Sequence, residues 1–342
     1  GHALGAKKKP AAVHLIYCPL DFYFFVRATL KAVRPALLVI FEVEIWPNLI
    51  LQAQARGIPL ALANGRMSDN SARGYAKHRW LFQRLFGAFS SLCVQSQDDA
   101  DRVRRVLGKD AEVHACNTMK FDQVPDSDQD DAVAEAVQAE MDRAFGPTER
   151  LIFVAGSTHG GEEELMADTV RELRMEIPAL RMVLVPRHVE RTPEVEAALK
   201  AQGLSYRLLK DDTSDATEPV DVLVVNTTGE LMNYYAAADV VFVGKSLGGN
   251  EGGHNIIEPA IFGKAILHGA NMQNFRDVAR IFREADAAVE LAEDTGFAPE
   301  LRRLLTDETA RAGLAQRSRS VVENQRGAID HTLDLVIPLH RS

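Results

Sequence analysis

The strongest constraint on the fold is a repeated alternation of short apolar runs and helical segments. In the first half, strands are expected at 12–17, 36–41, 60–63, 92–95 and 113–115. In the second half, they are expected at 151–155, 182–185, 222–225, 240–243 and 265–267. Apolar strands that alternate with amphipathic helices are typical of parallel sheets covered on both faces. The chain is therefore predicted to be an α/β protein with doubly wound sheets.

An acidic, alanine-rich stretch interrupts this rhythm at 126–142 and predicts a solvated helix that joins two domains. Gly146 and Pro147 mark the expected boundary. We expect an N-terminal domain at 1–145, a C-terminal domain at 146–325, and a C-terminal helix or tail at 326–342. A length of 342 residues suits two domains of ordinary size.

Composition excludes several classes of protein. A net charge of −9 argues against nucleic-acid binding, which needs a basic face. No apolar run approaches the ~18 residues of a membrane span. Cys18, Cys93 and Cys116 lie far apart, without disulfide or metal spacing, and are expected to be buried thiols. No metal site and no cofactor are predicted, because no His, Asp or Glu cluster has ligand spacing.

Glycines crowd the loop after the strand at 240–243. The strand breaks at Gly244, and further glycines stand at 248, 249, 252 and 253 before a helix expected from about Ile256. Glycine lets backbone N–H groups approach an anion, which a helix N-terminus also attracts. The loop therefore predicts a pocket for a nucleotide or a nucleotide sugar.

Glu258 lies in the first turn of that helix, where a carboxylate suits sugar hydroxyls better than a phosphate, because like charges repel. An alternative needs no ligand. Asn255 and Glu258 have the spacing of a capping box, which satisfies backbone N–H groups at the helix start.

Charged side chains follow the strands of the first half. Glu42 and Glu44 come directly after an apolar run and before a helix that begins at Pro47. We expect a site role for Glu42, and for Glu44 the stabilisation of the helix N-terminus. Lys120, after the last strand, could neutralise a developing anion. Arg66 could meet an anionic acceptor, whereas the nearby Ser68 or Asn70 could cap the next helix.

The second half has similar strand ends. Ser157, Thr158 and His159 follow one strand, where hydroxyls and N–H groups suit an anion, although Thr158 could simply be an N-cap. Arg187 ends the next strand and supplies a permanent cation. Of the ten histidines, His254 is the one expected to contact a ligand.

Several of these segments together resemble the Kdo (3-deoxy-D-manno-octulosonic acid) transferase family. The Gly-Gly-His-Asn-x-x-Glu-Pro run at 252–259 is one of them, and the Phe-Glu-Val-Glu-Ile-Trp-Pro-Asn run at 41–48 is another. The Asn-x-x-Lys-Phe-Asp segment at 117–122 also matches, although Cys116 replaces the family's glycine. Gly-Ser-Thr-His, Pro-Arg-His and Gly-Glu-Leu segments follow in the family's order, and the resemblance extends from residue 1 to about 282.

The resemblance implies the GT-B architecture, in which two Rossmann-like domains face a cleft. It further implies an inverting glycosyltransferase that moves Kdo from CMP-Kdo to a lipid A precursor at the cytoplasmic face of the inner membrane. Carried over by motif, Glu42 and Lys120 would stabilise the transition state. The residues that would bind CMP are Pro186, Arg187, Gly229, Glu230, Leu231, Asn255, Ile256, Ile257 and Glu258.

One departure concerns the start of the chain. Members of the family begin with a membrane-anchoring segment and a Gly-Glu pair whose glutamate is the general base. Neither is found here, so we expect the sequence to begin downstream of both and the N-terminal domain to be truncated. Two alternatives remain open: another GT-B enzyme that uses a UDP-sugar, and a non-catalytic nucleotide-binding fragment without the general base.

Overall fold

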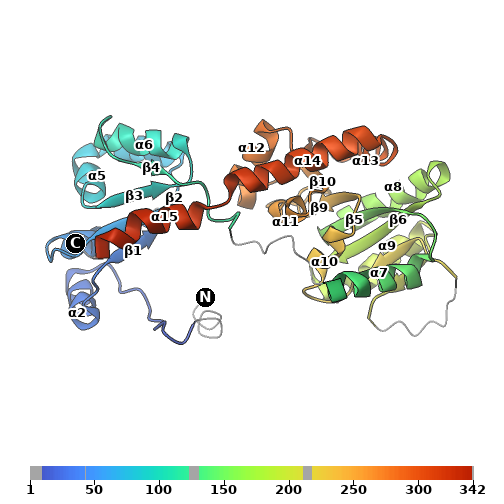
Figure 1. Ribbon diagram of the computed structural model, residues 1–342, viewed down its shortest axis with the longest axis horizontal. Helices are drawn as coiled ribbons and strands as arrows, with labels where there is room; N and C mark the ends of the chain where they lie inside the picture. Colours follow the sequence, from blue (N-terminus) through green and yellow to red (C-terminus); the bar gives the residue numbers. More distant parts are fainter. Residues whose placement is uncertain (1–9, 43, 123–130, 211–217, 341–342) are drawn as a thin grey trace. The chain divides into compact units, whose positions relative to one another are not determined.

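The computed structural model describes residues 10–42, 44–122, 131–210 and 218–340. The chain divides into two compact units, and each is described by itself (Figure 1). The first unit comprises residues 1–122 together with 325–342, and the second comprises residues 123–324. None of the helices within the described residues combines the length and the apolar character needed to cross a membrane.

The first unit is built on a sheet of four parallel strands in the order β1-β2-β3-β4. These strands are β1 (Leu38–Phe41), β2 (Leu60–Gly65), β3 (Ser91–Val94) and β4 (His114–Ala115). Its helices are α2 (Tyr23–Val33), α3 (Pro47–Gln54), α4 (Asp69–Lys77), α5 (Arg79–Phe86), α6 (Gln97–Leu107) and α15 (Ala328–Val336).

The side chains of β2 point alternately to the two faces of the sheet. Leu60 and Leu62 join the larger core cluster, which includes side chains of the helices from α2 to α6. Ala61 points the other way, into a small cluster with Cys93 and Val336 of α15. The expected separate tail at 326–342 is therefore wrong, because its helix covers the second face of the first sheet (Figure 1).

A carboxylate fastens that helix. Asp122 accepts hydrogen bonds from the backbone N–H groups of Gly327, at 2.8 Å, and Ile329, at 2.7 Å. Both donors lie at the start of α15, where N–H groups have no partner within the helix. The Asp122 side chain thus ties the chain that follows β4 to the C-terminal helix.

The second unit contains a sheet of seven parallel strands in the order β11-β10-β9-β5-β6-β8-β7. The strands are β5 (Leu151–Thr158), β6 (Leu180–Pro186), β7 (Tyr206–Leu208), β8 (Val222–Val224), β9 (Val240–Val243), β10 (Ala265–Gly269) and β11 (Val289–Leu291). The sequence did not predict β7 and β11, which are short outer strands. The helices are α7 (Asp131–Phe145), α8 (Glu162–Glu176), α9 (Thr192–Ala201), α10 (Leu231–Ala236), α11 (Ile257–Ile261), α12 (Arg276–Glu284), α13 (Phe297–Thr306) and α14 (Glu308–Gln325).

The helix expected to join the domains belongs to the second unit. In α7, Val137, Met141 and Phe145 are buried, and the helix contacts α10 and β8. Their spacing places all three on one helix face, while the acidic residues occupy the rest of the surface. The boundary expected at residue 145 therefore lies near residue 122.

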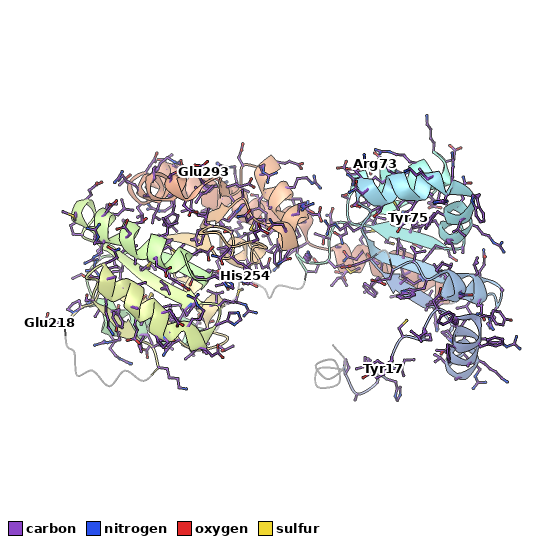
Figure 2. The ribbon with its side chains drawn as sticks, turned by 180° about the vertical axis from the view of Figure 1, so that it is seen from behind. Tyr17, Arg73, Tyr75, Glu218, His254 and Glu293 are labelled. Carbon is purple, nitrogen blue, oxygen red and sulfur yellow. The ribbon has the colours of Figure 1, made fainter. Side chains whose placement is uncertain are left out.

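The strand expected at 12–17 is absent from the described residues. This segment has no regular secondary structure and its residues are exposed, with Tyr17 at 77% of its possible exposure (Figure 2). An apolar run becomes a strand only where a neighbouring strand pairs with it. Cys18 is also exposed, so the prediction of three buried thiols holds only for Cys93 and Cys116.

Candidate functional site

The carboxyl ends of the strands carry unusual backbone geometry in both units. Seven non-glycine residues among those described have a positive φ, and five of them stand at or just after a strand end. The five are Glu42 (φ 57°), Asn64 (φ 53°), Asn117 (φ 66°), Ser157 (φ 55°) and Lys245 (φ 63°). Such left-handed conformations cost of the order of 1–3 kcal/mol each and cluster at functional sites. These edges are therefore where a site is expected on backbone geometry alone.

In the first unit, Asn64 connects the predicted site residues. The N–H of Glu42 donates to the carbonyl of Ala63 at 3.0 Å, which holds Glu42 beside the end of β2. The side-chain oxygen of Asn64 accepts from the N–H of Met119 at 3.1 Å. This bond draws the loop after β4 back across the sheet, although β1 and β4 are opposite edges. An exposed Glu42 and a half-buried Lys120 thus share one end of the sheet.

The role expected for Glu44 is wrong. Asp21 occupies the N-terminus of α3, where its carboxylate accepts from the N–H groups of Asn48, at 3.0 Å, and Leu49, at 2.9 Å. Glu44 is exposed and makes no side-chain hydrogen bond to another described residue. Asp21 lies 27 residues before Asn48, so no local pattern could have revealed it.

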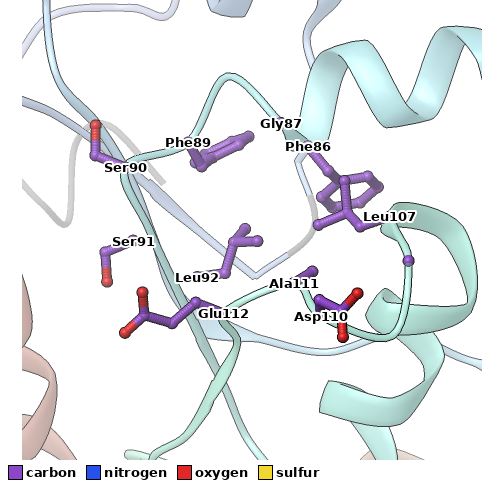
Figure 3. Close-up of a pocket in the computed structure, with 11 residues that line it drawn as sticks. Phe86, Gly87, Phe89, Ser90, Ser91, Leu92, Leu107, Asp110, Ala111 and Glu112 are labelled. Carbon is purple, nitrogen blue, oxygen red and sulfur yellow. The ribbon is translucent and has the colours of Figure 1, made fainter.

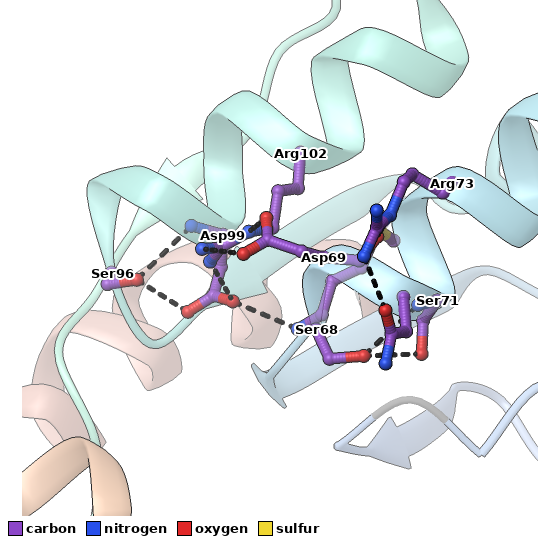
Figure 4. A network of polar contacts seen from close by, with 9 residues as sticks. Ser68, Asp69, Ser71, Arg73, Ser96, Asp99 and Arg102 are labelled. Carbon is purple, nitrogen blue, oxygen red and sulfur yellow. Dashed lines mark hydrogen bonds and ion pairs between the residues drawn. The ribbon is translucent and has the colours of Figure 1, made fainter.

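Beyond β2, the polar side chains fasten helices together (Figure 4). Ser68 caps α4 by accepting from the N–H of Ser71 at 3.1 Å, which confirms the capping alternative for Ser68. Asp69 binds Arg102 of α6 at 2.7 Å, and this guanidinium lowers the pKa of the Asp69 carboxyl. The buried Asp99 accepts from the N–H of Met67 at 2.9 Å. This network ties α4 and the residues after β2 to α6 and so supports the fold.

A pocket of about 450 Å³ opens in the first unit at the other end of the strands (Figure 3). Its lining includes Ser90 and Ser91 at the start of β3, and Ala111 and Glu112 just before β4. Ligands of parallel α/β sheets bind at the carboxyl ends of the strands. This pocket lies at the amino ends and does not include Glu42 or Lys120.

In the second unit, a buried carboxylate occupies the glycine-rich loop. Glu162 is fully buried, and its Oε1 accepts from the N–H groups of Ser246, at 2.9 Å, and Leu247, at 3.1 Å. Its Oε2 accepts from the N–H groups of Lys245, at 2.9 Å, and His159, at 3.0 Å. Burial raises the pKa of Glu162, and these four hydrogen bonds oppose that shift.

The predicted anion cradle is therefore wrong for this part of the loop. The N–H groups that a ligand phosphate would use already bind the protein's own carboxylate. The next N–H along the chain, that of Gly248, donates to Asp294 at 3.0 Å. A Cβ on Gly244 would lie 2.4 Å from the carbonyl oxygen of Ser157, so this glycine permits a close approach between two backbones.

The predicted nucleotide-binding segments nonetheless lie side by side. Pro186 and Arg187 lie at the end of β6, Gly229–Leu231 follow β8, and Asn255–Glu258 follow β9. In the sheet, β6 lies next to β8, and β5 lies between β6 and β9. Chain order reverses between β5 and β9, and an open sheet has its binding crevice at such a switch point. Pro186 is the buried last residue of β6, and Arg187 follows it with an exposed side chain. The guanidinium of Arg187 makes no hydrogen bond or ion pair with another described residue.

The carboxylate of Glu258 is bound by the side chain of Asn255. Asn255 donates from its side-chain amide to the Glu258 carboxylate at 3.3 Å, and accepts from the N–H of Ile257 at 3.2 Å. Asn255 thus accepts from an N–H at the start of α11, which confirms its half of the capping alternative, whereas the Glu258 carboxylate does not accept from the N–H of Asn255. Burial raises the pKa of Glu258, while Asn255 and the charge of Arg187 oppose that shift. Ile256 and Ile257 are fully buried and serve as packing.

The third predicted segment, Gly229–Leu231, precedes and begins the six-residue helix α10. Glu230 is half-buried and accepts from the side-chain amide of Asn233 at 2.9 Å. Gly229 is exposed with φ 99°, a conformation that favours glycine. Thr158 is not the N-cap expected for the helix that follows β5, because α8 begins at Glu162.

A histidine pair lies at the switch point and was not predicted. His254, labelled in Figure 2, places its Nε2 atom 3.2 Å from the Nε2 atom of His159. The rings are stacked, with centroids 5.4 Å apart, and His188 lies edge-on to His159 at 5.8 Å. Burial is the main cause that lowers the pKa of both His159 and His254 to about 4. Among the described residues, no group of three or more His, Cys, Asp or Glu side chains could hold a metal ion.

Comparison with known proteins identifies the family. The family model described as 3-deoxy-D-manno-octulosonic-acid transferase (kdotransferase) matches residues 1–123. The 3-deoxy-D-manno-octulosonic acid transferase of Haemophilus influenzae is 31% identical over 325 residues, which cover 94% of this chain and 74% of that protein. The enzyme of the same description from Bordetella pertussis is 32% identical over 323 residues, covering 93% and 72%. The chain belongs to the 3-deoxy-D-manno-octulosonic acid transferase family. It is a glycosyltransferase.

Solved structures support the fold of this Kdo transferase. The C-terminal CMP-Kdo binding domain of WaaA from Acinetobacter baumannii matches with a TM-score of 0.51 and 24% identity, covering 57% of this chain and all of that domain. MurG from the same organism matches with a TM-score of 0.53 and 13% identity, covering 92% of this chain and 77% of MurG. The prediction of an α/β fold of the GT-B type is confirmed.

We predict that Glu162→Gln destabilises the second unit by about 2–5 kcal/mol, because the amide nitrogen would face two N–H groups that then lack an acceptor. Hydrogen exchange of β5 and β9, combined with chemical denaturation, measures the loss. Glu164→Gln is the control, since Glu164 is an exposed residue of the same helical turn that accepts one N–H, from Gly161. Equal effects of the two substitutions would contradict the role given to Glu162.

Proposed function

We propose that this Kdo transferase moves Kdo from CMP-Kdo to a lipid A precursor, with inversion at the anomeric carbon. The carrying observation is the set of side chains at neighbouring strand ends of the second unit. There, an exposed guanidinium without an ion pair among the described residues, a half-buried carboxylate and a histidine pair lie near the switch point between β5 and β9. A nucleoside monophosphate requires a cation that binds its phosphate and an acceptor that binds its sugar hydroxyls.

In this proposal the second unit binds the nucleotide. Arg187 binds the phosphate, and its planar guanidinium can form two parallel hydrogen bonds to phosphate oxygens. Glu258, oriented by Asn255, accepts hydrogen bonds from the ribose hydroxyls. Pro186, Gly229, Glu230 and Leu231 shape the pocket through backbone atoms and packing. The description of the WaaA domain as CMP-Kdo binding supports this choice of nucleotide.

The first unit contributes to the transfer itself. The acceptor hydroxyl attacks the anomeric carbon as a general base takes its proton, and the bond from that carbon to the phosphate oxygen breaks with the electron pair leaving on CMP. Lys120 balances the negative charge near the reacting centre, and Glu42 stabilises the positive charge that develops at the sugar carbon. A lipid-linked acceptor places the reaction at a membrane surface, for which we propose the cytoplasmic face of the inner membrane.

The full 342-residue chain is expected to bind CMP more tightly than UMP or UDP. Titration calorimetry with the three nucleotides at the same pH and salt concentration measures this preference directly. The comparison distinguishes a CMP-sugar donor from a UDP-sugar donor. UDP binding as tight as CMP binding would instead favour an enzyme that uses a UDP-sugar.

Replacing Arg187 with alanine should weaken CMP binding by about 1.5–3 kcal/mol, the range for hydrogen bonds to a charged group. The melting temperature should stay close to that of the parent chain, because the Arg187 side chain is exposed. Arg171→Ala, on the exposed surface of α8, is the control and should leave CMP affinity unchanged. An unchanged CMP affinity in Arg187→Ala would show that the phosphate is held elsewhere. A collapse of its melting temperature would show that Arg187 is structural.

A further inference from the structure

The contact between His159 and His254 has a chemical constraint of its own. At 3.2 Å, their two Nε2 atoms form a hydrogen bond only if one nitrogen carries a proton and the other offers a lone pair. Two neutral rings meet this condition. Two protonated rings do not, because two N–H groups would then face each other.

Cationic groups surround the pair. Two of these cations are Lys245 and Arg187, and their side chains make no hydrogen bond or ion pair with another described residue. The charge of each opposes protonation of both rings. His188 and Arg191 also face His159, and Arg191 is neutralised in part by Glu163 at 2.9 Å.

The acidic groups near the pair are already occupied. Glu162 accepts the N–H groups of His159 and Lys245, and Glu258 is bound to Asn255. The side chain of Lys245 passes close to Gly252, since a Cβ there would lie 3.3 Å from Lys245 Cε. Gly252 is two residues before His254, so this cation lies close to the histidine pair. Lys245 and Arg187 are therefore cations that act on both rings and whose side chains have no carboxylate partner among the described residues.

We propose that the His159–His254 pair takes up a proton when the phosphate of the donor nucleotide binds. This inference rests on the proposed function, because it places a nucleotide phosphate on Arg187 and Lys245. The phosphate neutralises the cations that oppose protonation and adds negative charge beside the rings. The proton comes from the solvent, and one ring becomes charged while it keeps its hydrogen bond to the neutral ring. The second N–H of the charged ring then becomes available to a phosphate oxygen.

Proton uptake fixes the direction of the pH dependence. Binding and protonation favour each other by the same factor, so nucleotide affinity must fall as pH rises. The pair then has a second consequence for transfer, since a protonated histidine beside the phosphate stabilises the negative charge of the departing CMP.

Titration calorimetry of CMP with the full chain tests the proposal. Measurements near pH 7 in buffers of different ionisation enthalpy give the number of protons taken up per CMP bound, which we expect to be about 0.5 or more. His159→Gln and His254→Gln should each reduce it to below about 0.2. His331→Gln, on the exposed surface of α15, is the control and should leave the number unchanged.

Nitrogen NMR of isotope-labelled histidine identifies which group takes the proton. We expect neutral His159 and His254 rings without CMP and a charged ring in the complex. A charged His188 with the pair still neutral, or CMP binding without proton uptake, would overturn the inference and leave the proposed function intact. A chain that does not bind CMP at all would overturn both.

Discussion

The arrangement of the second unit depends on one buried carboxylate. Glu162 joins the loop after β5 to the loop after β9 through four backbone hydrogen bonds. A fully buried charge persists only where hydrogen bonds replace its hydration. Its position in the first turn of α8, a 15-residue helix, adds the favourable field of the helix N-terminus. The two loops that flank the switch point are therefore held by the protein before any ligand arrives.

This constraint determines which groups remain for a ligand. The N–H groups of residues 245–248 bind protein carboxylates, and we therefore propose that recognition uses the side chains of Arg187, Lys245, His254 and Glu258. The first unit follows the same logic, since Asp122 satisfies the N–H groups that begin α15 and Asn64 fixes the loop that carries Lys120. In both units, polar side chains at strand ends fix the loops, and neighbouring charged side chains stay accessible.

Local patterns predicted much of this fold. Apolar runs predicted β2, β5 and β9, because these central strands are buried on both faces and need few non-apolar residues. The motifs at strand ends located the segments around Lys120, Arg187 and Glu258. The roles of individual residues at the site stay predictions.

The features that could not be predicted from the sequence depend on contacts between residues far apart along the chain. Asp21 caps a helix 27 residues later, and Glu162 binds N–H groups 83 to 85 residues later. A glycine-rich loop shows where backbones can approach closely, but not whether the partner is a ligand or another part of the chain. The segment at 12–17 fails for a related reason, since its apolar character does not specify a pairing partner.

A crystal structure of the full chain with CMP tests the central claim most directly. We expect the phosphate to lie within about 2.7–3.2 Å of the Arg187 guanidinium, with Glu162 still bound to the N–H groups of Lys245, Ser246 and Leu247. A phosphate bound instead to those N–H groups, with the Glu162 carboxylate displaced, would contradict it.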